Sequence, residues 1–350
     1  MRIAQLAPLA ESVPPRGYGG SELVVSLLTE ELVKRGHDVT LFASAESETA
    51  GRLVACAPEG LRASDIPPTR WHAYNIKTLI KLEEMQDQFD IIHNHMGYAA
   101  LPALNEMRCP SVTTNHNPVY DYCRDIFFAY SKLPFISISD AYRQLNYPND
   151  LNYVATVYNG INLEDFAIDN SIERKHLLFL GRLCHDKGTK EAIQIARKLG
   201  MPIVLAGKVD KNDEPYFEEH VKPLLKEPDV EFIGEVSTQQ KYALYNSAIA
   251  TLCPIKFDEP FGLVFSESLA CGTPVMAFRR GAAPEVISDG ETGVIGETLE
   301  ELVERFGEIQ NITPQTCRER VAKLFSKEKM TDSYENAFRT VLSRSLVAQR

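Results

Sequence analysis

Residues 258–274 read DEPFGLVFSESLACGTP, and the interpretation of the whole chain depends on this stretch. Two carboxylates, Glu259 and Glu267, lie on either side of a Pro-Phe-Gly corner. The strand-like segment 250–253 precedes the corner, and the apolar and small residues 263–270 are typical of a buried helix. The stretch therefore predicts a strand, a tight turn and the N-terminus of a helix.

This turn has the properties of an anion-binding site. It places the backbone amides of Phe261, Gly262 and Leu263 at a helix N-terminus, where N–H groups lack partners within the helix and attract phosphate. Glu259 precedes the phosphate position and Glu267 lies deeper, at most ~12 Å away at a helical rise. A nucleoside-diphosphate sugar has a similar length, so our working hypothesis is that each carboxylate holds the hydroxyls of one sugar.

Length and composition limit the class of protein. The 350 residues are enough for two domains, and 44% hydrophobic with 24% charged residues is typical of a globular protein. A net charge of −11 disfavours sequence-independent binding to nucleic acid, which needs a basic surface. No apolar run approaches the ~18 to 20 residues that span a bilayer, so we expect at most peripheral membrane contact.

The cysteines indicate a reducing compartment. No CxxC pair occurs and several cysteines lie in apolar runs, which predicts reduced core residues of a cytoplasmic protein instead of disulfides or a zinc site. The seven positions are Cys56, Cys109, Cys123, Cys184, Cys253, Cys271 and Cys317.

The first half of the chain has the alternating strands and helices of an α/β sheet. A strand at 2–6, a glycine loop at 17–20, a helix at 22–35 capped by Ser21 and a strand at 39–43 form one βαβ unit. The spacing GxGxxG is absent from this loop. Residues 50–72 are polar and rich in proline, and we expect them to form a loop.

The same alternation of strands and helices resumes after a polar linker at 158–175. Segment 176–180 predicts a buried strand, further strands follow, and apolar spacing after residue 327 predicts a long terminal helix. Repeats of 20 to 50 residues are absent from the sequence. The expected architecture is therefore two Rossmann-like α/β domains whose parallel sheets face a central cleft.

A basic pair follows the first strand of the second half. Arg182 and Lys187 lie in the loop 181–188, where a guanidinium and an ammonium can clamp a diphosphate. The plain alternative is a solvated basic turn.

The two glutamates also have plain alternatives. Both can be surface carboxylates, although Glu267 lies within an otherwise uncharged run and is costly to bury without a partner. Paired carboxylates also occur in glycoside hydrolases. The phosphate-binding helix end between them argues against hydrolysis, because a hydrolase needs that space for the scissile bond.

Polar residues collect where first-half strands end, which is where open α/β sheets bind ligands. His116 can donate to a sugar hydroxyl or a phosphate-linked oxygen, or it can simply cap a loop. His93 and His95 share a strand face but lack a third metal ligand nearby. Gly19 and Gly20 before a helix offer a second anion-accepting N-terminus, or only a flexible loop.

Together these residues resemble the retaining GT-B glycosyltransferases, specifically family 4 (glycosyl transferases group 1). The resemblance covers nearly the whole chain, and the segment with two glutamates is its most specific part. The matching segments are 18–22, 42–44, 89–93, 113–116, 137–140, 158–162, 181–188, 232–234, 259–267 and 284–293.

The resemblance implies a role for each matching position. Arg182 and Lys187 would bind the donor diphosphate beside the amides of Phe261 to Leu263. Glu267 would hold the ribose hydroxyls and Glu259 those of the transferred hexose. The remaining expected donor contacts are His116 at the sugar 6-hydroxyl, Gly19 and Gly20 at the phosphates, and Lys208 and Val236 near the base. The catalytic set so implied is His116, Glu259, Arg182 and Lys187.

The resemblance also implies the domains and the reaction. Residues 1–165 would form the acceptor-side domain and 166–326 the donor domain, with 327–350 a helix that crosses back to the first domain. The enzyme would move a hexose from a nucleoside-diphosphate sugar, with a UDP-sugar favoured, and would need no cofactor and no metal. The absence of an Asp-x-Asp triplet in the sequence agrees with this expectation.

Two alternatives stay open, a nucleotide-sugar epimerase and a non-catalytic nucleotide-sugar binder of the same fold. The acceptor is also open among a sugar, a lipid-linked glycan and a small molecule, because the loop at 117–132 matches no acceptor-binding loop that we can assign. An epimerase would need an acid and base pair at the hexose, for which Glu259 and His116 are the candidates.

Overall fold

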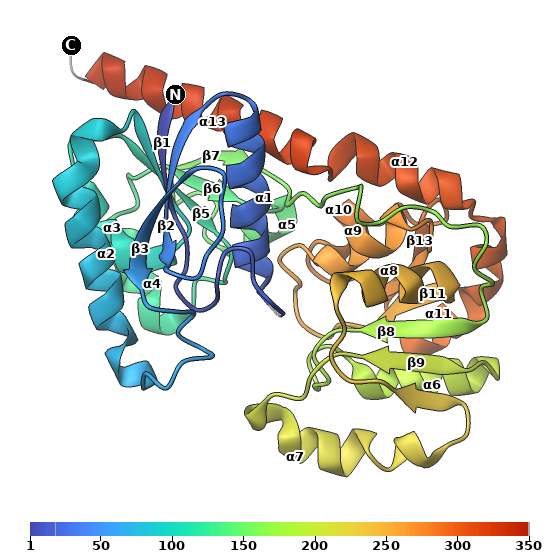
Figure 1. Cartoon of the computed structure of the whole chain (residues 1–350). Coiled ribbons are helices and arrows are strands. Elements are labelled where there is room, and N and C mark those ends of the chain that lie inside the picture. Colours follow the sequence, from blue (N-terminus) through green and yellow to red (C-terminus); the bar gives the residue numbers. More distant parts are fainter. Residues whose placement is uncertain (18, 349–350) are drawn as a thin grey trace. The chain divides into compact units, whose positions relative to one another are not determined.

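The computed structural model describes residues 1–17 and 19–348, and the chain folds into two compact units (Figure 1). The first unit comprises Met1–Gly160 together with the segment from Lys327 onward, and the second comprises Ile161–Ser326. The division after residue 160 lies five residues before the expected division after 165. Residue 18 of the first expected motif and residues 349–350 of the expected terminal helix lie outside the described residues.

The first unit contains a parallel sheet. Its strands are β1 (Arg2–Leu6), β2 (Asp38–Ser44), β3 (Arg52–Ala57), β4 (Ile91–Asn94), β5 (Ser111–Asn115), β6 (Phe135–Ser137) and β7 (Tyr153–Thr156). They lie in the order β3-β2-β1-β4-β5-β6-β7. The expectation that residues 50–72 form a loop is wrong, because β3 pairs with β2 and extends the sheet.

Helices cover this sheet. They are α1 (Gly20–Lys34), α2 (Trp71–Met85), α3 (Leu101–Glu106), α4 (Asp121–Ala129), α5 (Asp140–Leu145) and α13 (Lys327–Ala348), with short 3-10 turns at Pro68–Arg70, Gln86–Gln88 and Gly97–Ala100. The terminal helix α13, red in Figure 1, packs against α1. The guanidinium of Arg35 lies 2.8 Å from Asp332, and His37 lies 2.6 Å from Glu335. These pairs tie α13 to the chain just after α1.

The predicted cap of α1 is wrong. Ser21 lies inside the helix, which begins at Gly20, and Gly19 is the N-cap residue without a side-chain hydrogen bond. The N–H of Leu23 donates to the carbonyl oxygen of Gly19 at 2.9 Å, so the first turn starts two residues earlier than predicted. A side chain at Gly19 would lie 2.7 Å from Pro15, which explains why a glycine and not a serine occupies the cap.

The second unit contains another parallel sheet. Its strands are β8 (His176–Leu180), β9 (Ile203–Ala206), β10 (Val230–Phe232), β11 (Ala248–Cys253), β12 (Val275–Phe278) and β13 (Gly293–Gly296), in the order β10-β9-β8-β11-β12-β13. The helices are α6 (Thr189–Leu199), α7 (Glu214–Tyr216), α8 (Thr238–Ser247), α9 (Leu263–Ala270), α10 (Ala283–Val286), α11 (Leu299–Glu304) and α12 (Pro314–Leu324). A π-helical turn spans Phe217–Val221, and 3-10 turns span Lys211–Asp213, Leu224–Lys226 and Arg305–Asn311.

Both sheets reverse their strand order once. In the first unit the order reverses between β1 and β4, and in the second between β8 and β11. Loops at such a reversal diverge from the carboxyl ends of neighbouring strands, and open α/β sheets bind ligands there. The fold therefore directs attention to the loops after β1 and β4 and to those after β8 and β11.

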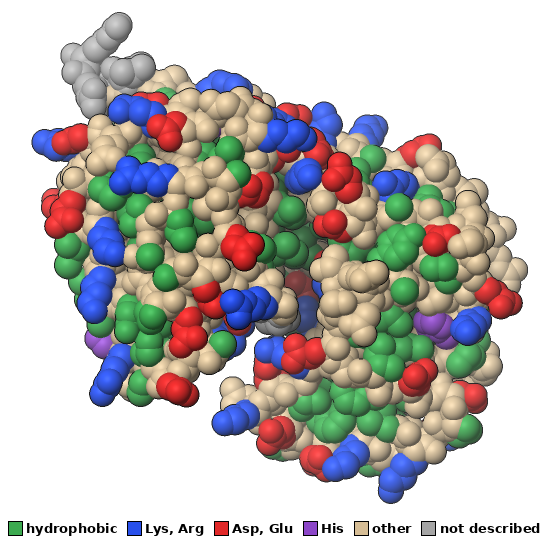
Figure 2. Space-filling view, in the orientation of Figure 1, with side chains coloured by type: hydrophobic (Ala, Val, Ile, Leu, Met, Phe, Trp, Pro, Cys, Tyr) green, Lys and Arg blue, Asp and Glu red, His purple; other side chains and the backbone are tan. Residues whose placement is uncertain are grey.

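The distribution of charged and cysteine side chains fits the composition of the chain. Basic and acidic side chains are interspersed on the face shown in Figure 2. The seven cysteines all lie among the described residues and are all buried as free thiols. No helix among the described residues is long and apolar enough to cross a membrane.

Candidate functional site

The loops that follow β8 and β11 meet through an ion pair. The ammonium of Lys187, after β8, lies 2.5 Å from a carboxylate oxygen of Glu259, after β11. The same ammonium lies 4.9 Å from the centre of the Phe257 ring, a cation–π distance. The sequence placed both residues in the site, and the structure brings their charged groups together at the strand-order reversal.

Two close backbone approaches hold these loops in place. Gly188 has a φ of +74°, and a Cβ there would lie 2.0 Å from the carbonyl oxygen of Pro254. Gly281 approaches Glu259 in the same way, since its Cβ would lie 2.3 Å from the Glu259 carbonyl oxygen. That oxygen accepts a hydrogen bond from the Ala282 N–H at 2.8 Å. The backbone of Glu259 is therefore fixed from both sides.

The Pro-Phe-Gly corner forms the N-terminus of α9. Gly262 is the N-cap residue with a φ of +81°, and no side chain caps the helix. The Phe265 N–H donates to the Gly262 carbonyl oxygen at 2.9 Å, while the Phe261 ring is buried against Phe325. The buried ring anchors the corner, and the first amides of α9 start directly beside Glu259, as the sequence predicted.

Glu267 lies inside α9 and is almost completely buried, with 3% of its surface exposed. Its carboxylate accepts hydrogen bonds from the Tyr245 hydroxyl at 2.9 Å and from the Lys241 ammonium at 3.2 and 3.3 Å. Burial and the neighbouring carboxylate raise the pKa of Tyr245 well above its usual value. Tyr245 is therefore a neutral donor, and the carboxylate keeps lone pairs for a further hydroxyl.

Arg182 and Lys208 pair with two aspartates that follow β9. Arg182 pairs with Asp210 and Asp213 at 3.5 and 3.4 Å, and Lys208 lies 2.8 Å from Asp210. Burial raises the pKa of Asp210, but the hydrogen bond and charge of Lys208 and the charge of Arg182 outweigh it and lower the pKa. The half-buried Val236 lies in the loop before α8. Any diphosphate here would compete with these aspartates for Arg182.

In the first unit, three histidines form a hydrogen-bonded row at the ends of β4 and β5. His93 Nδ1 lies 3.1 Å from His95 Nε2, and His95 Nδ1 lies 2.8 Å from His116 Nε2. Burial, followed by the neighbouring histidines, lowers the pKa of His93 and His95 well below its usual value. Burial lowers the pKa of His116 to about 4. All three are therefore neutral at pH 7.

Other features of the described residues are less informative. No group of three or more histidine, cysteine, aspartate or glutamate side chains there has the arrangement of a metal site.

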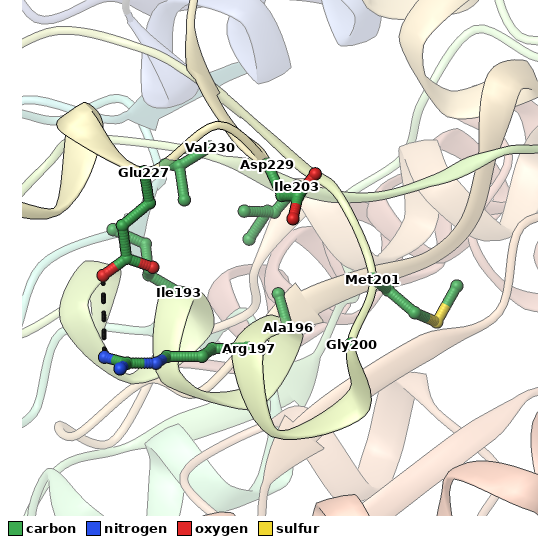
Figure 3. Close-up of a pocket in the computed structure, with 9 residues that line it drawn as sticks. All are labelled: Ile193, Ala196, Arg197, Gly200, Met201, Ile203, Glu227, Asp229 and Val230. Atoms are coloured by element: carbon green, nitrogen blue, oxygen red, sulfur yellow. Dashed lines mark ion pairs between the residues drawn. The ribbon is translucent and has the colours of Figure 1, made fainter.

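Gly19 is buried and Gly20 exposed at the start of α1, after the loop that follows β1. A hollow of about 90 Å³ lies beside α6. Figure 3 shows its lining residues, which include Ile193, Arg197 and Glu227. Pockets that hold drug-sized ligands measure ~300 to 1,000 Å³, so a nucleotide sugar does not fit this hollow.

The comparison with known families decides the identity. Residues 18–165 match the family described as "Glycosyltransferase Family 4", and residues 163–330 match "Glycosyl transferases group 1". The chain belongs to the family 4 glycosyltransferases. A phosphatidyl-myo-inositol mannosyltransferase of Mycolicibacterium smegmatis is 27% identical over 316 residues, which cover 84% of this chain and 80% of that protein.

Solved structures show the same fold for this glycosyltransferase. A sucrose-phosphate synthase of Thermosynechococcus elongatus superposes with a TM-score of 0.81 at 19% identity, covering 98% of this chain and 100% of that one. The HepE protein of Anabaena, solved with UDP-glucose, gives 0.74 at 16% identity, covering 98% and 100%. With two parallel-sheet α/β units, the glycosyltransferase has the GT-B fold.

Sequence reasoning missed several partners of the glycosyltransferase site residues. Tyr245 and Lys241 come from α8, and Asp210 and Asp213 follow β9. One signal for α8 was present, since Ser237 and Gln240 form a capping box that orients the helix. The pairing of α8 with Glu267 depends on packing between distant segments, and local spacing does not encode it.

Proposed function

We propose that this glycosyltransferase moves a hexose from a nucleoside-diphosphate sugar, with a UDP-sugar favoured, to an acceptor hydroxyl with retention of configuration and without a metal ion. The observation that carries the proposal is the arrangement at the reversal between β8 and β11. Lys187, the start of α9 and the two glutamates follow one another there within the second unit.

The arrangement suits a donor with two sugars and a diphosphate. Glu267, held by Tyr245 and Lys241, is the buried carboxylate for the ribose hydroxyls. Glu259, held by Lys187, is the carboxylate for the hexose. The first amides of α9 lie along the chain between the two glutamates, and Lys187 pairs with Glu259, so both would meet the diphosphate.

The charges support an electrostatic role for the protein. When the bond from hexose to phosphate breaks, negative charge grows on the diphosphate, and preorganised cations and amides stabilise that charge. Lys187, Arg182 and the α9 N-terminus supply these groups. By family resemblance the leaving phosphate accepts the acceptor's proton on the same face of the sugar, so no protein nucleophile is needed.

Two observations bear on the donor and on the role of His116. The structure of HepE with UDP-glucose shows that a protein of this fold binds a UDP-sugar, which supports the same donor class here. We assign His116 to the donor sugar by resemblance to the family. We place Gly19 and Gly20 near the phosphates, and Lys208 and Val236 near the base, on the same ground.

The epimerase alternative is disfavoured by the state of the candidate acid and base. An epimerase needs a group that gives up a proton and one that accepts it at the hexose. The Glu259 carboxylate is engaged by Lys187, and burial lowers the pKa of His116 to about 4, so that His116 is a poor acid at neutral pH.

Thermal unfolding with a panel of UDP-, GDP- and ADP-sugars in excess chelator tests the proposal. A ligand at 100 times its dissociation constant stabilises the folded protein by ~2.7 kcal/mol, which raises the midpoint measurably. We expect a UDP-sugar to raise the midpoint most. No shift with any nucleotide sugar, or a shift that needs a divalent ion, would contradict the proposal.

A further inference from the structure

The histidine row of the first unit continues to the terminal helix. His93 Nε2 lies 2.7 Å from the Thr114 hydroxyl, and that hydroxyl lies 3.3 Å from the Tyr334 hydroxyl of α13. The rings of His93 and Tyr334 also pack together, with centroids 4.9 Å apart. A continuous chain of hydrogen bonds thus runs from α13 through Thr114, His93 and His95 to His116.

Every link in this chain depends on the direction of the others. A neutral histidine carries one ring proton, so it donates at one nitrogen and accepts at the other. If His95 carries its proton on Nε2, its Nδ1 must accept from His116; if it carries the proton on Nδ1, it must donate to His116. The proton position on His95 also decides whether His93 Nδ1 accepts or donates. That in turn decides whether His93 Nε2 donates to the Thr114 hydroxyl or accepts from it.

Gln5 on β1 decides the direction. The carboxamide oxygen of Gln5 lies 3.0 Å from His95 Nε2, which also lies 3.1 Å from His93 Nδ1. A single N–H can be shared between two acceptors in a three-centre hydrogen bond, which proteins commonly form. In the opposite direction the Gln5 oxygen would face the lone pair of His95 Nε2 and lose its donor; if the carboxamide turned over, its N–H would compete with His93 Nδ1–H for that one lone pair. His95 Nε2 is therefore the donor.

We propose that His95 is a positioning residue that, with Gln5 and Thr114, holds His116 in the tautomer with its proton on Nε2. His116 Nε2–H then donates to His95 Nδ1, and His93 Nε2–H donates to the Thr114 hydroxyl. The hydrogen bond that joins His116 to the chain is made by its Nε2, which leaves Nδ1 outside the chain. In this tautomer His116 Nδ1 only accepts a hydrogen bond, and we assign this nitrogen to the ligand.

This assignment narrows the ligand chemistry. An acceptor nitrogen can receive a hydrogen bond from a hydroxyl but not from a phosphate oxygen, which has no proton to give at neutral pH. Of the two partners that the sequence allowed for His116, a sugar hydroxyl and a phosphate-linked oxygen, only the hydroxyl fits. This conclusion about the ligand rests on the proposed function; the tautomer itself does not.

The buried environment keeps the chain neutral. His93 and His95 are 0% and 4% exposed, and Tyr334 is fully buried, where burial raises its pKa. Each link is therefore an uncharged donor and acceptor at pH 7. A change at the far end should then alter the proton position on His116, two histidines away.

Thr114 offers a matched pair of variants. Thr114→Val has nearly the same shape but removes the hydroxyl, which leaves His93 Nε2–H without its acceptor. Reversal of the chain relieves this loss, because His93 can then carry its proton on Nδ1. Thr114→Ser keeps the hydroxyl and serves as the control.

Long-range nitrogen–proton correlation spectra of protein with ¹⁵N-labelled histidine rings test the proposal without any ligand. Signals are assigned with the variant His116→Gln. At pH 7.5 we expect His93, His95 and His116 all protonated on Nε2. In Thr114→Val we expect the fraction of His116 protonated on Nδ1 to rise about tenfold, the effect of one unpaired buried donor, with no change in Thr114→Ser.

Two results would overturn the proposal. One is a His116 ring that carries its proton on Nδ1 in the wild-type protein. The other is a His116 tautomer that does not respond to Thr114→Val although His93 loses its partner. A failure of every nucleotide sugar to bind would instead contradict the proposed function and leave the tautomer result standing.

Discussion

The three histidines at the ends of β4 and β5 make the first unit sensitive to acid. Their pKa values in the folded protein lie below the ordinary value near ~6.5 that they regain on unfolding. The unfolded chain therefore binds more protons below pH ~6.5, and the free energy of unfolding falls as the pH decreases. Each buried histidine contributes a slope of up to ~1.4 kcal/mol per pH unit, which for His116 ends near pH 4.

Urea unfolding between pH 7.5 and 5.5 measures this slope above the range where most carboxylates titrate. We expect the midpoint of the first unit to fall steadily across this range. His72→Asn provides the control, because it removes a histidine whose side chain is exposed in the folded protein. A midpoint that stays constant or increases toward pH 5.5 would show that these histidines are not buried in the neutral form.

For single residues, the sequence predicted which side chains have the required chemistry. It did not predict which of these side chains contact one another. It selected Glu259, Glu267 and Lys187 from residue type and spacing. It did not reveal that His93, His95 and His116 form one row, because β4 and β5 pair only in the folded sheet. The link from Thr114 to Tyr334 joins residues 220 positions apart, and local spacing contains no trace of it.

The element that most tightly constrains the site is α9 with its glycine cap. Gly262 has a φ of +81°, and a Cβ there would lie 2.5 Å from the Phe265 ring. We expect Gly262→Ala to lower the free energy of unfolding of the second unit by ~1 to 3 kcal/mol, through backbone strain and displacement of the ring.

Gly307→Ala is the matched control for this prediction. Nothing lies within 4 Å of a Cβ at Gly307, and its φ lies outside the left-handed range. Chemical denaturation of both variants should show a loss of stability for Gly262→Ala and little change for Gly307→Ala. Equal stabilities would mean that the corner adapts and that the helix N-terminus beside Glu259 is not rigid.

The sequence correctly predicted the strands and helices whose local hydrophobic pattern and turn residues are strong. The buried strand β8, the corner and α9 were all placed correctly, since apolar runs and turn residues signal them locally. Strand β3 was missed because its short segment lies within a polar, proline-rich stretch and depends on pairing with β2. The start of α1 was misplaced because a backbone glycine caps it where a serine was expected.

For the whole molecule, the seven buried cysteines give a prediction that covers both units. Burial raises the pKa of every thiol, to about 12 for Cys109, Cys271 and Cys317. Reaction with a thiol reagent needs the thiolate, so we expect negligible labelling of the native protein at pH 8. All seven should react in denaturant. Fast labelling of a native thiol would contradict the packing around that cysteine.

The family and the two-unit α/β architecture were predictable from the sequence, because the motifs recur in order along nearly the whole chain. The acceptor was not predictable, since its choice depends on loops such as 117–132 that match no assignable pattern. Glu267 and Glu259 should each hold a different end of one nucleotide sugar.

Calorimetric binding of UDP and of a UDP-hexose to Glu259→Gln and Glu267→Gln tests whether the two glutamates divide the donor in this way. Glu267→Gln should weaken both ligands about tenfold or more, because both contain the ribose, and a hydrogen bond to a charged group contributes ~1.5 to 3 kcal/mol. Glu259→Gln should leave UDP binding unchanged or tighter, since Lys187 is released, and should remove the extra affinity from the hexose. If both variants affect both ligands equally, or Glu267→Gln binds UDP like the wild type, the claim is wrong.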